Sequence, residues 1–134
     1  MKRFLLTYST VRLMSTKPKY IVLSGEDLKE NVASLIQNDW KLQDDSKAIT
    51  KSYEFKGFSA SWVSWVNISF INFNNQAFLT EVAMYSHKKN HHAEIWNVYN
   101  KVKLTLTTHD VNGLTTKDVD FAKYCDKLLE DTKN

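Results

Sequence analysis

The apolar residues near the start of the chain repeat with the spacing of a helix. They recur at intervals of three and four residues, at Leu28, Val32, Leu35 and Ile36. Such intervals place the side chains on one helix face. Ser24 stands where its hydroxyl could cap the first turn, and Glu26 and Asp27 suit the positive end of the helix dipole. The pattern predicts a helix from about Ser24 to Asn38 or Asp39.

Two strands are expected next, because the apolar spacing changes from helical to alternating. Trp40 and Leu42 begin the first strand, and the polar run 44–47 forms a turn. In the second strand, every other residue lies on one face, which consists of Ile49, Lys51, Tyr53 and Phe55. Alternation of this kind predicts a strand with one buried face.

The pattern over residues 58–89 is mainly helical, and alternation returns after Glu94. One face of that later stretch carries Val98, Asn100, Val102, Leu104 and Leu106, and the other carries Tyr99, Lys101, Lys103, Thr105, Thr107 and His109. A bend at Asn100 and Lys101 would divide the stretch into two strands. We therefore expect a helix followed by a further pair of strands.

A last helix is expected after Gly113. Thr115 is the candidate N-cap, and Asp118 three residues later completes a partial capping box. The apolar stripe of this helix consists of Val119, Ala122, Cys125 and Leu129. Cys125 is therefore expected to be a small core residue rather than a nucleophile.

The order helix, two strands, helix, two strands, helix predicts an α+β fold, in which helices cover one face of a four-stranded antiparallel sheet in two layers. The chain has 134 residues, of which 43% are apolar, and this suits one domain with a single core. The net charge of +3 does not demand a nucleic-acid partner, and no run approaches the roughly 20 apolar residues that cross a membrane. The single cysteine excludes an internal disulfide framework and suits a reducing compartment, so we expect a cytoplasmic location.

Residues 1–19 differ in composition from the rest of the chain. They carry five basic residues and several hydroxyl side chains, and Glu26 is the first acidic residue. This composition is typical of a mitochondrial presequence, although a disordered tail can have it too. Met14 could serve as a second start that omits most of the segment. We therefore expect a basic extension over residues 1–19 and one domain over residues 20–134.

The second half of the chain holds all four histidines: His87, His91, His92 and His109. Neutral imidazoles around one cavity suit acid–base chemistry near pH 7, because their unperturbed pKa is about 6.5. The spacing taken alone would also fit scattered surface histidines. The short motifs around the histidines indicate a function more specifically than the histidine spacing does.

Four short blocks carry that signal: Asn90 to Glu94, Asn97 to Val102, Leu106 to His109, and Gly113 to Thr115 with Asp118. Together they closely resemble the pterin-4a-carbinolamine dehydratase family, which is also known as the dimerisation cofactor of a hepatocyte homeodomain factor. The resemblance extends from about Ser24 to Leu129, apart from one internal segment. It departs at Ala93, where the family usually has proline, and at Ile95, where it often has an aromatic residue.

The resemblance implies a hydro-lyase that removes water from 4a-hydroxytetrahydropterin in tetrahydrobiopterin recycling. It implies His91, His92 and His109 as catalytic residues, and Asp118, Glu94, Trp96 and Thr108 as substrate-binding residues. We expect His91 and His109 to handle protons on opposite sides of the ring, while His92 orients the substrate. The reaction needs no metal or redox cofactor. The resemblance also implies a homodimer or homotetramer, with an exposed strand edge as a natural seam.

Two alternatives remain at this stage. His87 and His91 have the i, i+4 spacing of two ligands on one helix face, and Glu94 or His109 could complete a zinc site. However, Lys88 stands where the HExxH motif has glutamate. The second alternative is a non-catalytic dimerisation cofactor of a transcription factor, which would have the same fold but would not need the three histidines.

The internal segment that departs from the family is Val63 to Gln76, 14 residues long. Removing it joins Trp62 to Ala77 and leaves Phe58, Trp62, Leu79 and Ala83 on one helical stripe. The residues of the segment are poor helix formers. However, 14 residues are close to four helical turns, so an inserted helix would nearly preserve the alignment of the apolar stripe on either side of it. Valine codons begin with GT and one glutamine codon ends in AG, so the two boundaries permit an in-frame intron. The sequence thus suggests an insertion that the mature protein lacks.

We expect transcripts of this chain to lack the codons for residues 63–76, because their removal restores a continuous amphipathic helix. Sequencing the message tests this directly. Transcripts that all retain these codons would contradict the intron hypothesis.

Overall fold

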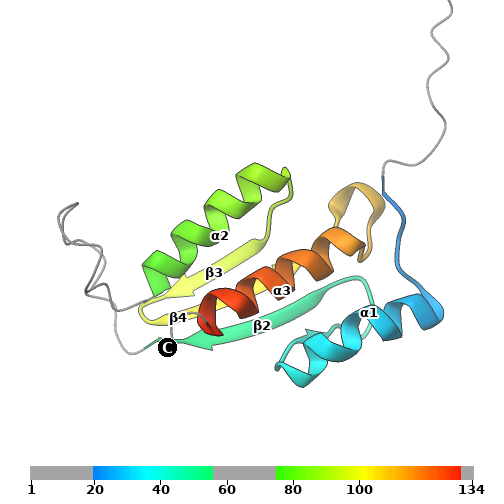
Figure 1. The fold of residues 1–134 in the computed structure, drawn as a ribbon, viewed down its shortest axis with the longest axis horizontal. Helices are drawn as coiled ribbons and strands as arrows, with labels where there is room; N and C mark the ends of the chain where they lie inside the picture. The colour runs from blue at the N-terminus through cyan, green and yellow to red at the C-terminus, as the bar shows by residue number, and fades with distance from the viewer. Residues whose placement is uncertain (1–19, 56–74, 131–134) are drawn as a thin grey trace, which may run out of the picture.

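The computed structural model describes residues 20–55 and 75–130, and Figure 1 shows their arrangement. The elements in chain order are α1 (Gly25–Gln37), β1 (Lys41–Leu42), β2 (Ile49–Glu54), α2 (Asn75–Lys89), β3 (Glu94–Val98), β4 (Lys101–Leu106), the 3₁₀ helix η3 (His109–Val111) and α3 (Thr116–Glu130). This order confirms the predicted α+β class. None of the described helices is both long enough and apolar enough to cross a membrane.

The four strands form one antiparallel sheet in the order β1-β2-β4-β3. In Figure 1, α3 runs over the sheet between α1 and α2. The face of the sheet that the helices cover is apolar at its centre, where Ile49, Val102, Leu104 and Leu106 are at most 1% exposed. The opposite, outer face carries the alternate residues of each strand, which are exposed or half-buried. The alternation in the sequence therefore predicted the core face of β2 and β4 correctly.

The hairpin between β3 and β4 corrects one expectation. Tyr99 has a φ of 52° and turns the chain, so that Val98 pairs with Lys101 rather than continuing the buried face of Val102. Val98 lies on the outer face and is 53% exposed. The amide of Asn100 donates to the Phe55 carbonyl at 2.7 Å, which fixes the turn against the end of β2. The predicted bend is therefore a full reversal of the chain.

Helix α1 follows its predicted bounds, with two differences in side-chain roles. Ser24 is the N-cap residue, but its side chain makes no capping hydrogen bond. Ile36 is 52% exposed instead of buried with the stripe of Leu28, Val32 and Leu35. Asp39 ends the helix with a φ of 65°, in the left-handed region.

Three earlier expectations fall on residues that the structure leaves out. Residues 1–19 lie outside the described parts, as do residues 56–74, which include most of the predicted second helix and of the insertion. Described helix α2 begins at Asn75, so only the last two residues of the insertion, Asn75 and Gln76, belong to it. The extension and the insertion stay predictions.

A buried ion pair joins α3 to the first two strands. Lys51 of β2 faces inward, as the alternation predicted, and its amine lies 2.7 Å from the Asp126 carboxylate. The indole N–H of Trp40, which is 1% exposed, donates to the same carboxylate at 3.1 Å, and the Asn38 amide donates at 3.3 Å. The Asp126 carboxylate thus accepts hydrogen bonds from three donors on the side of the sheet that the helices cover.

Replacement of Asp126 with alanine is expected to lower the free energy of unfolding by about 3–5 kcal/mol, because Lys51 and Trp40 then lose their buried partner. Denaturant unfolding measures this. Asp120→Ala, on the exposed side of the same helix, is the matched control and should stay within about 0.5 kcal/mol of the wild type. A loss below about 1 kcal/mol for Asp126→Ala would show that the ion pair does not hold the layers together.

Candidate active site

The predicted site residues gather at one end of the sheet, where β3 begins, β4 ends and α3 begins. The loop between α2 and β3 carries His91 and His92, and the loop after β4 carries Thr108 and His109. The antiparallel pairing of Glu94 with Thr105 holds these loops at the same end. Asp118 comes from the first turn of α3.

The end of α2 determines where His91 points. Asn90 has a φ of 47°, its N–H donates to the His87 carbonyl at 3.2 Å, and the His91 N–H donates to the Ser86 carbonyl at 3.1 Å. These two bonds form a Schellman motif, in which one left-handed residue ends the helix. The chain therefore turns sharply at Asn90, and the His91 side chain is only 8% exposed.

His91 is bonded to the most buried carboxylate of the site. Its Nε2 lies 2.7 Å from Oδ1 of Asp118, which is 0% exposed. Because an ionised carboxylate only accepts hydrogen bonds, Nε2 is the donor, and a neutral ring then keeps its lone pair on Nδ1. Asp118 therefore fixes both the orientation and the tautomer of His91.

The second oxygen of Asp118 binds the loop after β4 and caps α3. Oδ2 accepts from the Thr108 hydroxyl at 2.7 Å, from the Thr115 N–H at 2.8 Å and from the Thr115 hydroxyl at 3.2 Å. The Thr115 hydroxyl oxygen in turn accepts from the Lys117 N–H at 3.3 Å. The predicted capping box is confirmed. Asp118 also has a second role, as the carboxylate that joins His91 to Thr108.

His109 lies outside this buried network, although Thr108 precedes it directly. Its Nε2 is 3.3 Å from Oε1 of Glu94, and the two side chains are 69% and 56% exposed. His92 is also exposed, and it forms no hydrogen bond or ion pair with any residue in the described ranges. The structure thus brings His91, Asp118 and Thr108 together in one cluster, and His109 and Glu94 in another.

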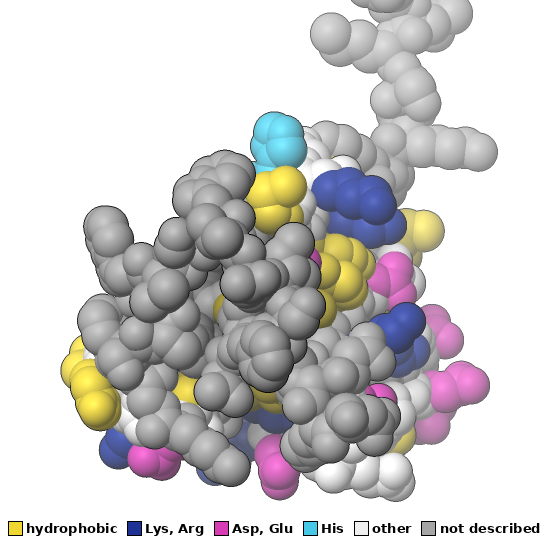
Figure 2. All heavy atoms as spheres, turned by 60° about the vertical axis from the view of Figure 1, so that its left-hand side comes forward, with side chains coloured by type: hydrophobic (Ala, Val, Ile, Leu, Met, Phe, Trp, Pro, Cys, Tyr) yellow, Lys and Arg dark blue, Asp and Glu magenta, His cyan; other side chains and the backbone are white. Residues whose placement is uncertain are grey.

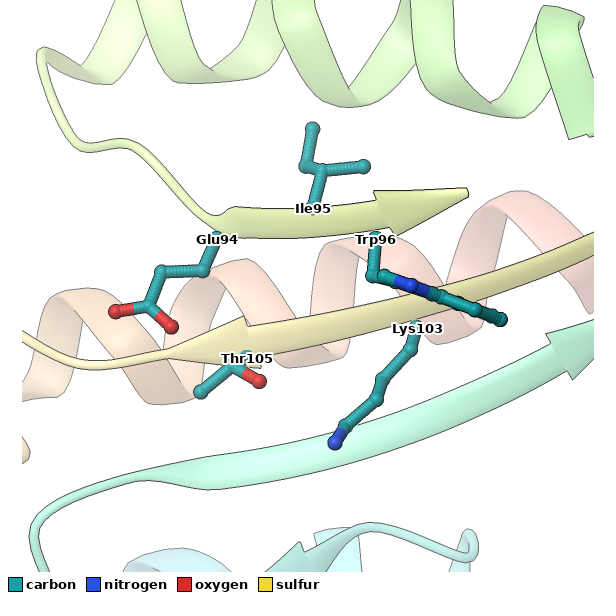
Figure 3. A pocket seen from close by; sticks show the side chains of 5 residues that line it. All are labelled: Glu94, Ile95, Trp96, Lys103 and Thr105. Carbon is teal, nitrogen blue, oxygen red and sulfur yellow. The ribbon is translucent and has the colours of Figure 1, made fainter. Parts of the chain in front are cut away.

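An open pocket of about 470 Å³ lies on the outer face of the sheet. It is lined by Glu94, Ile95, Trp96, Lys103 and Thr105. Figure 3 shows the Glu94 and Thr105 side chains at one end and the Trp96 ring beside Lys103 at the other. Two of the predicted substrate-binding residues, Glu94 and Trp96, therefore share a pocket, and Glu94 connects it to His109.

Sequence reasoning missed Lys103 and Thr105 as pocket residues. The alternation placed both on one face of their strand, but the chain gives no local sign that β3 pairs with that strand and brings Trp96 beside Lys103. More widely, basic and acidic side chains are interspersed on the face that Figure 2 shows. The pocket itself is lined by one acidic residue, Glu94, one basic residue, Lys103, and the exposed indole of Trp96.

The zinc alternative depended on a helix that continues through both His87 and His91. Helix α2 ends at Lys89, and the turn at Asn90 directs His91 to Asp118, while His87 stays exposed on the helix. The two rings therefore do not share a helix face. Within the described part of the chain, no three His, Cys, Asp or Glu side chains gather as a metal site.

Replacement of Asn90 with valine is expected to destabilise the protein by about 1–3 kcal/mol, because a β-branched residue is strained at a φ of 47°. Asn90→Gly should keep or slightly raise stability, because glycine adopts this conformation without strain. Thermal or denaturant unfolding of the two variants measures the difference. Equal stability would show that the left-handed turn does not constrain this loop.

The chain is similar to known proteins. Residues 22–128 match the family described as Pterin 4 alpha carbinolamine dehydratase. A protein of Rhizobium rhizogenes, named "Putative pterin-4-alpha-carbinolamine dehydratase", is 39% identical over 109 residues, which cover 81% of this chain and 92% of that protein. A protein of the same name from Novosphingobium aromaticivorans is 36% identical over 91 residues, covering 68% of this chain and 80% of its own.

A solved structure agrees with the sequence matches. The crystal structure of a transcriptional coactivator/pterin dehydratase from Brucella melitensis aligns with a TM-score of 0.64 and 31% identity, and it covers 80% of this chain and 97% of its own. The family match spans most of the chain, so the resemblance seen in the sequence is confirmed. The chain belongs to the pterin 4 alpha carbinolamine dehydratase family.

Proposed function

We propose that this protein is a 4a-hydroxytetrahydropterin dehydratase that acts by histidine acid–base catalysis in tetrahydrobiopterin recycling. The observations that carry the proposal are the hydrogen bond between His91 and the buried Asp118, and the contact of His109 with Glu94, which lines the outer pocket. Family membership and the names of the relatives support a dehydratase.

The chemistry requires two proton transfers. The hydroxyl group on C4a must be protonated to leave as water, and the proton on N5 must be removed so that the C4a=N5 double bond of the quinonoid dihydropterin forms. His109 is exposed beside the pocket and supplies the first proton, and Glu94 orients its ring. His91, whose Nε2–H donates to Asp118, accepts the second proton on Nδ1.

The remaining site residues position the substrate and the two histidines. Thr108 binds Asp118 and directly precedes His109 in the chain, so a movement of one histidine loop affects the other. Trp96 offers an exposed ring on which a planar pterin can stack. His92, in the loop between α2 and β3, orients the substrate. The reaction as proposed uses neither a metal nor a redox cofactor.

We also propose that the protein assembles through β3, as a homodimer or as a homotetramer built from such dimers. This strand is at the edge of the sheet, and all five of its residues are exposed. An edge strand offers unpaired backbone groups to a second copy of the chain. A non-catalytic role as a dimerisation cofactor of a transcription factor is the second candidate, because the Brucella melitensis relative is described as a coactivator as well as a dehydratase.

His91→Ala and His109→Ala are each expected to lower turnover of chemically generated 4a-hydroxytetrahydropterin by at least about tenfold, because each removes an acid or base. His87→Ala is the matched control, since His87 is exposed on α2 and makes no contact with Asp118 or Glu94. The dehydration rate, followed by absorbance, measures all three variants.

The same assay separates the alternatives. A wild-type rate that is unchanged by a chelator agrees with catalysis by histidines alone. An inactive wild-type protein would favour the dimerisation cofactor. If His87→Ala were as damaging as His91→Ala, the assignment of roles would be wrong.

A further inference from the structure

Lys117 lies in the first turn of α3, directly before Asp118, and takes no part in the proposed proton transfers. Its amine donates a hydrogen bond to the carbonyl oxygen of Lys89 at 3.3 Å. Lys89 is the last residue of α2, and the left-handed turn that directs His91 begins at the next residue. The Lys117 side chain therefore connects the start of α3 to the backbone that carries His91.

The carbonyl of Lys89 needs a partner from outside α2, because the last four carbonyls of a helix have none within it. Two of these four, those of Ser86 and His87, accept hydrogen bonds from the turn. The Lys117 amine binds the carbonyl of Lys89, and a cation at this end also interacts favourably with the helix dipole. Lys117 thus stabilises the end of α2 at the point where the chain turns toward the site.

The Tyr20 side chain keeps the Lys117 amine in this place. The amine donates to the Tyr20 hydroxyl at 3.2 Å and lies 4.5 Å from the centre of the ring, within the range of a cation–π interaction. The segment after Tyr20 is fixed against the loop before α3, because the Leu23 N–H donates to the Leu114 carbonyl at 2.7 Å. The segment that precedes α1 therefore holds Lys117 in position.

Two neighbouring residues of α3 bind the two ends of the turn at Asn90. Lys117 binds the backbone before the turn, and Asp118 binds the His91 ring after it. Because both bonds come from the same helical turn, they fix the backbone and the ring of His91 relative to one another. Loss of the Lys117 bond would leave the ring bonded to Asp118 but would loosen the backbone that carries the ring.

We propose that Lys117 is a positioning residue for His91, acting through the carbonyl of Lys89. The proposal rests on the proposed function, because it takes His91 as the group that accepts the N5 proton. Lys117 then affects the rate of dehydration through His91. It does not affect the binding of the substrate, because Lys117 does not line the outer pocket.

Steady-state kinetics of the dehydration tests the proposal. We expect Lys117→Met to lower kcat by about two- to fivefold with KM unchanged, which is the size of a cation's interaction with a helix end. Lys117→Arg should restore most of the rate, because a guanidinium group can donate to the same carbonyl. Lys123→Met removes an exposed lysine from the same helix, so it is the matched control and should leave kcat unchanged.

A double-mutant cycle distinguishes positioning of His91 from a general effect on the fold. In the His91→Ala background, Lys117→Met should cause no further loss of kcat, because the residue that it positions is gone. An equal loss of kcat in both backgrounds would overturn the proposal. A Lys117→Met variant with the kcat of the wild type would overturn it as well.

Hydrogen exchange tests the positioning without the reaction. Lys117→Met should raise the exchange rate of the Asn90 and His91 N–H groups, which bond to the end of α2, by about two- to fivefold. Lys123→Met should leave these two rates unchanged. Exchange at Asn90 and His91 that does not respond to Lys117→Met would contradict the proposal.

Failure of this proposal is distinct from failure of the proposed function. If the wild type is active and His91→Ala lowers its rate while Lys117→Met does not, only the positioning role of Lys117 is lost. If the wild type does not dehydrate 4a-hydroxytetrahydropterin, the proposed function fails, and the exchange measurement still decides whether Lys117 holds the turn before His91.

Discussion

The Asp118 carboxylate is the group on which the geometry of the site depends. It is completely buried, and a buried carboxylate is costly unless hydrogen bonds replace its hydration. Here the donors come from three places in the chain: His91 after α2, Thr108 after β4, and Thr115 at the start of α3. The hydrogen bonds that compensate for the burial of this carboxylate therefore also fix two loops and the start of α3 relative to each other. Its place in the first turn of α3 also suits the positive end of the helix dipole.

Helix α3 carries a second buried carboxylate about two turns further on. Asp126 binds Lys51 and Trp40, so α3 is held to the site at its start and to the first two strands near its end. Between them, the apolar side of the helix fills the core, and burial raises the pKa of the Cys125 thiol, which makes it a poor nucleophile. Among the described residues, one buried polar side-chain atom lacks a hydrogen bond. The Tyr53 hydroxyl has no hydrogen-bond partner among the described residues, and burial raises its pKa as well.

The two faces of the sheet divide the work between stability and binding. The inner residues of β2 and β4 are in the core, whereas four of the five pocket residues, Glu94, Trp96, Lys103 and Thr105, are outer residues of β3 and β4. Substitutions in the pocket can therefore change what is bound without disturbing the core. His91 is buried against Asp118 and His109 is exposed beside Glu94, and Thr108 connects their two loops because it binds Asp118 and precedes His109 in the chain.

The sequence by itself determined the order of helices and strands, the buried faces of β2 and β4, and the capping box of Thr115 and Asp118. These features depend on residues within a few positions of each other, so periodicity and local hydrogen bonding are sufficient to predict them. The family resemblance implied catalytic roles for three of the histidines, but it did not reveal that His91 is buried against Asp118, 27 positions away, or that Lys103 is the cross-strand partner of Trp96. The tertiary structure alone decided these pairs and the exposure of Val98. The partner of a buried polar group and the face of a hairpin residue are set by where the chain reverses and which strands pair, and neither is encoded within a short window of sequence.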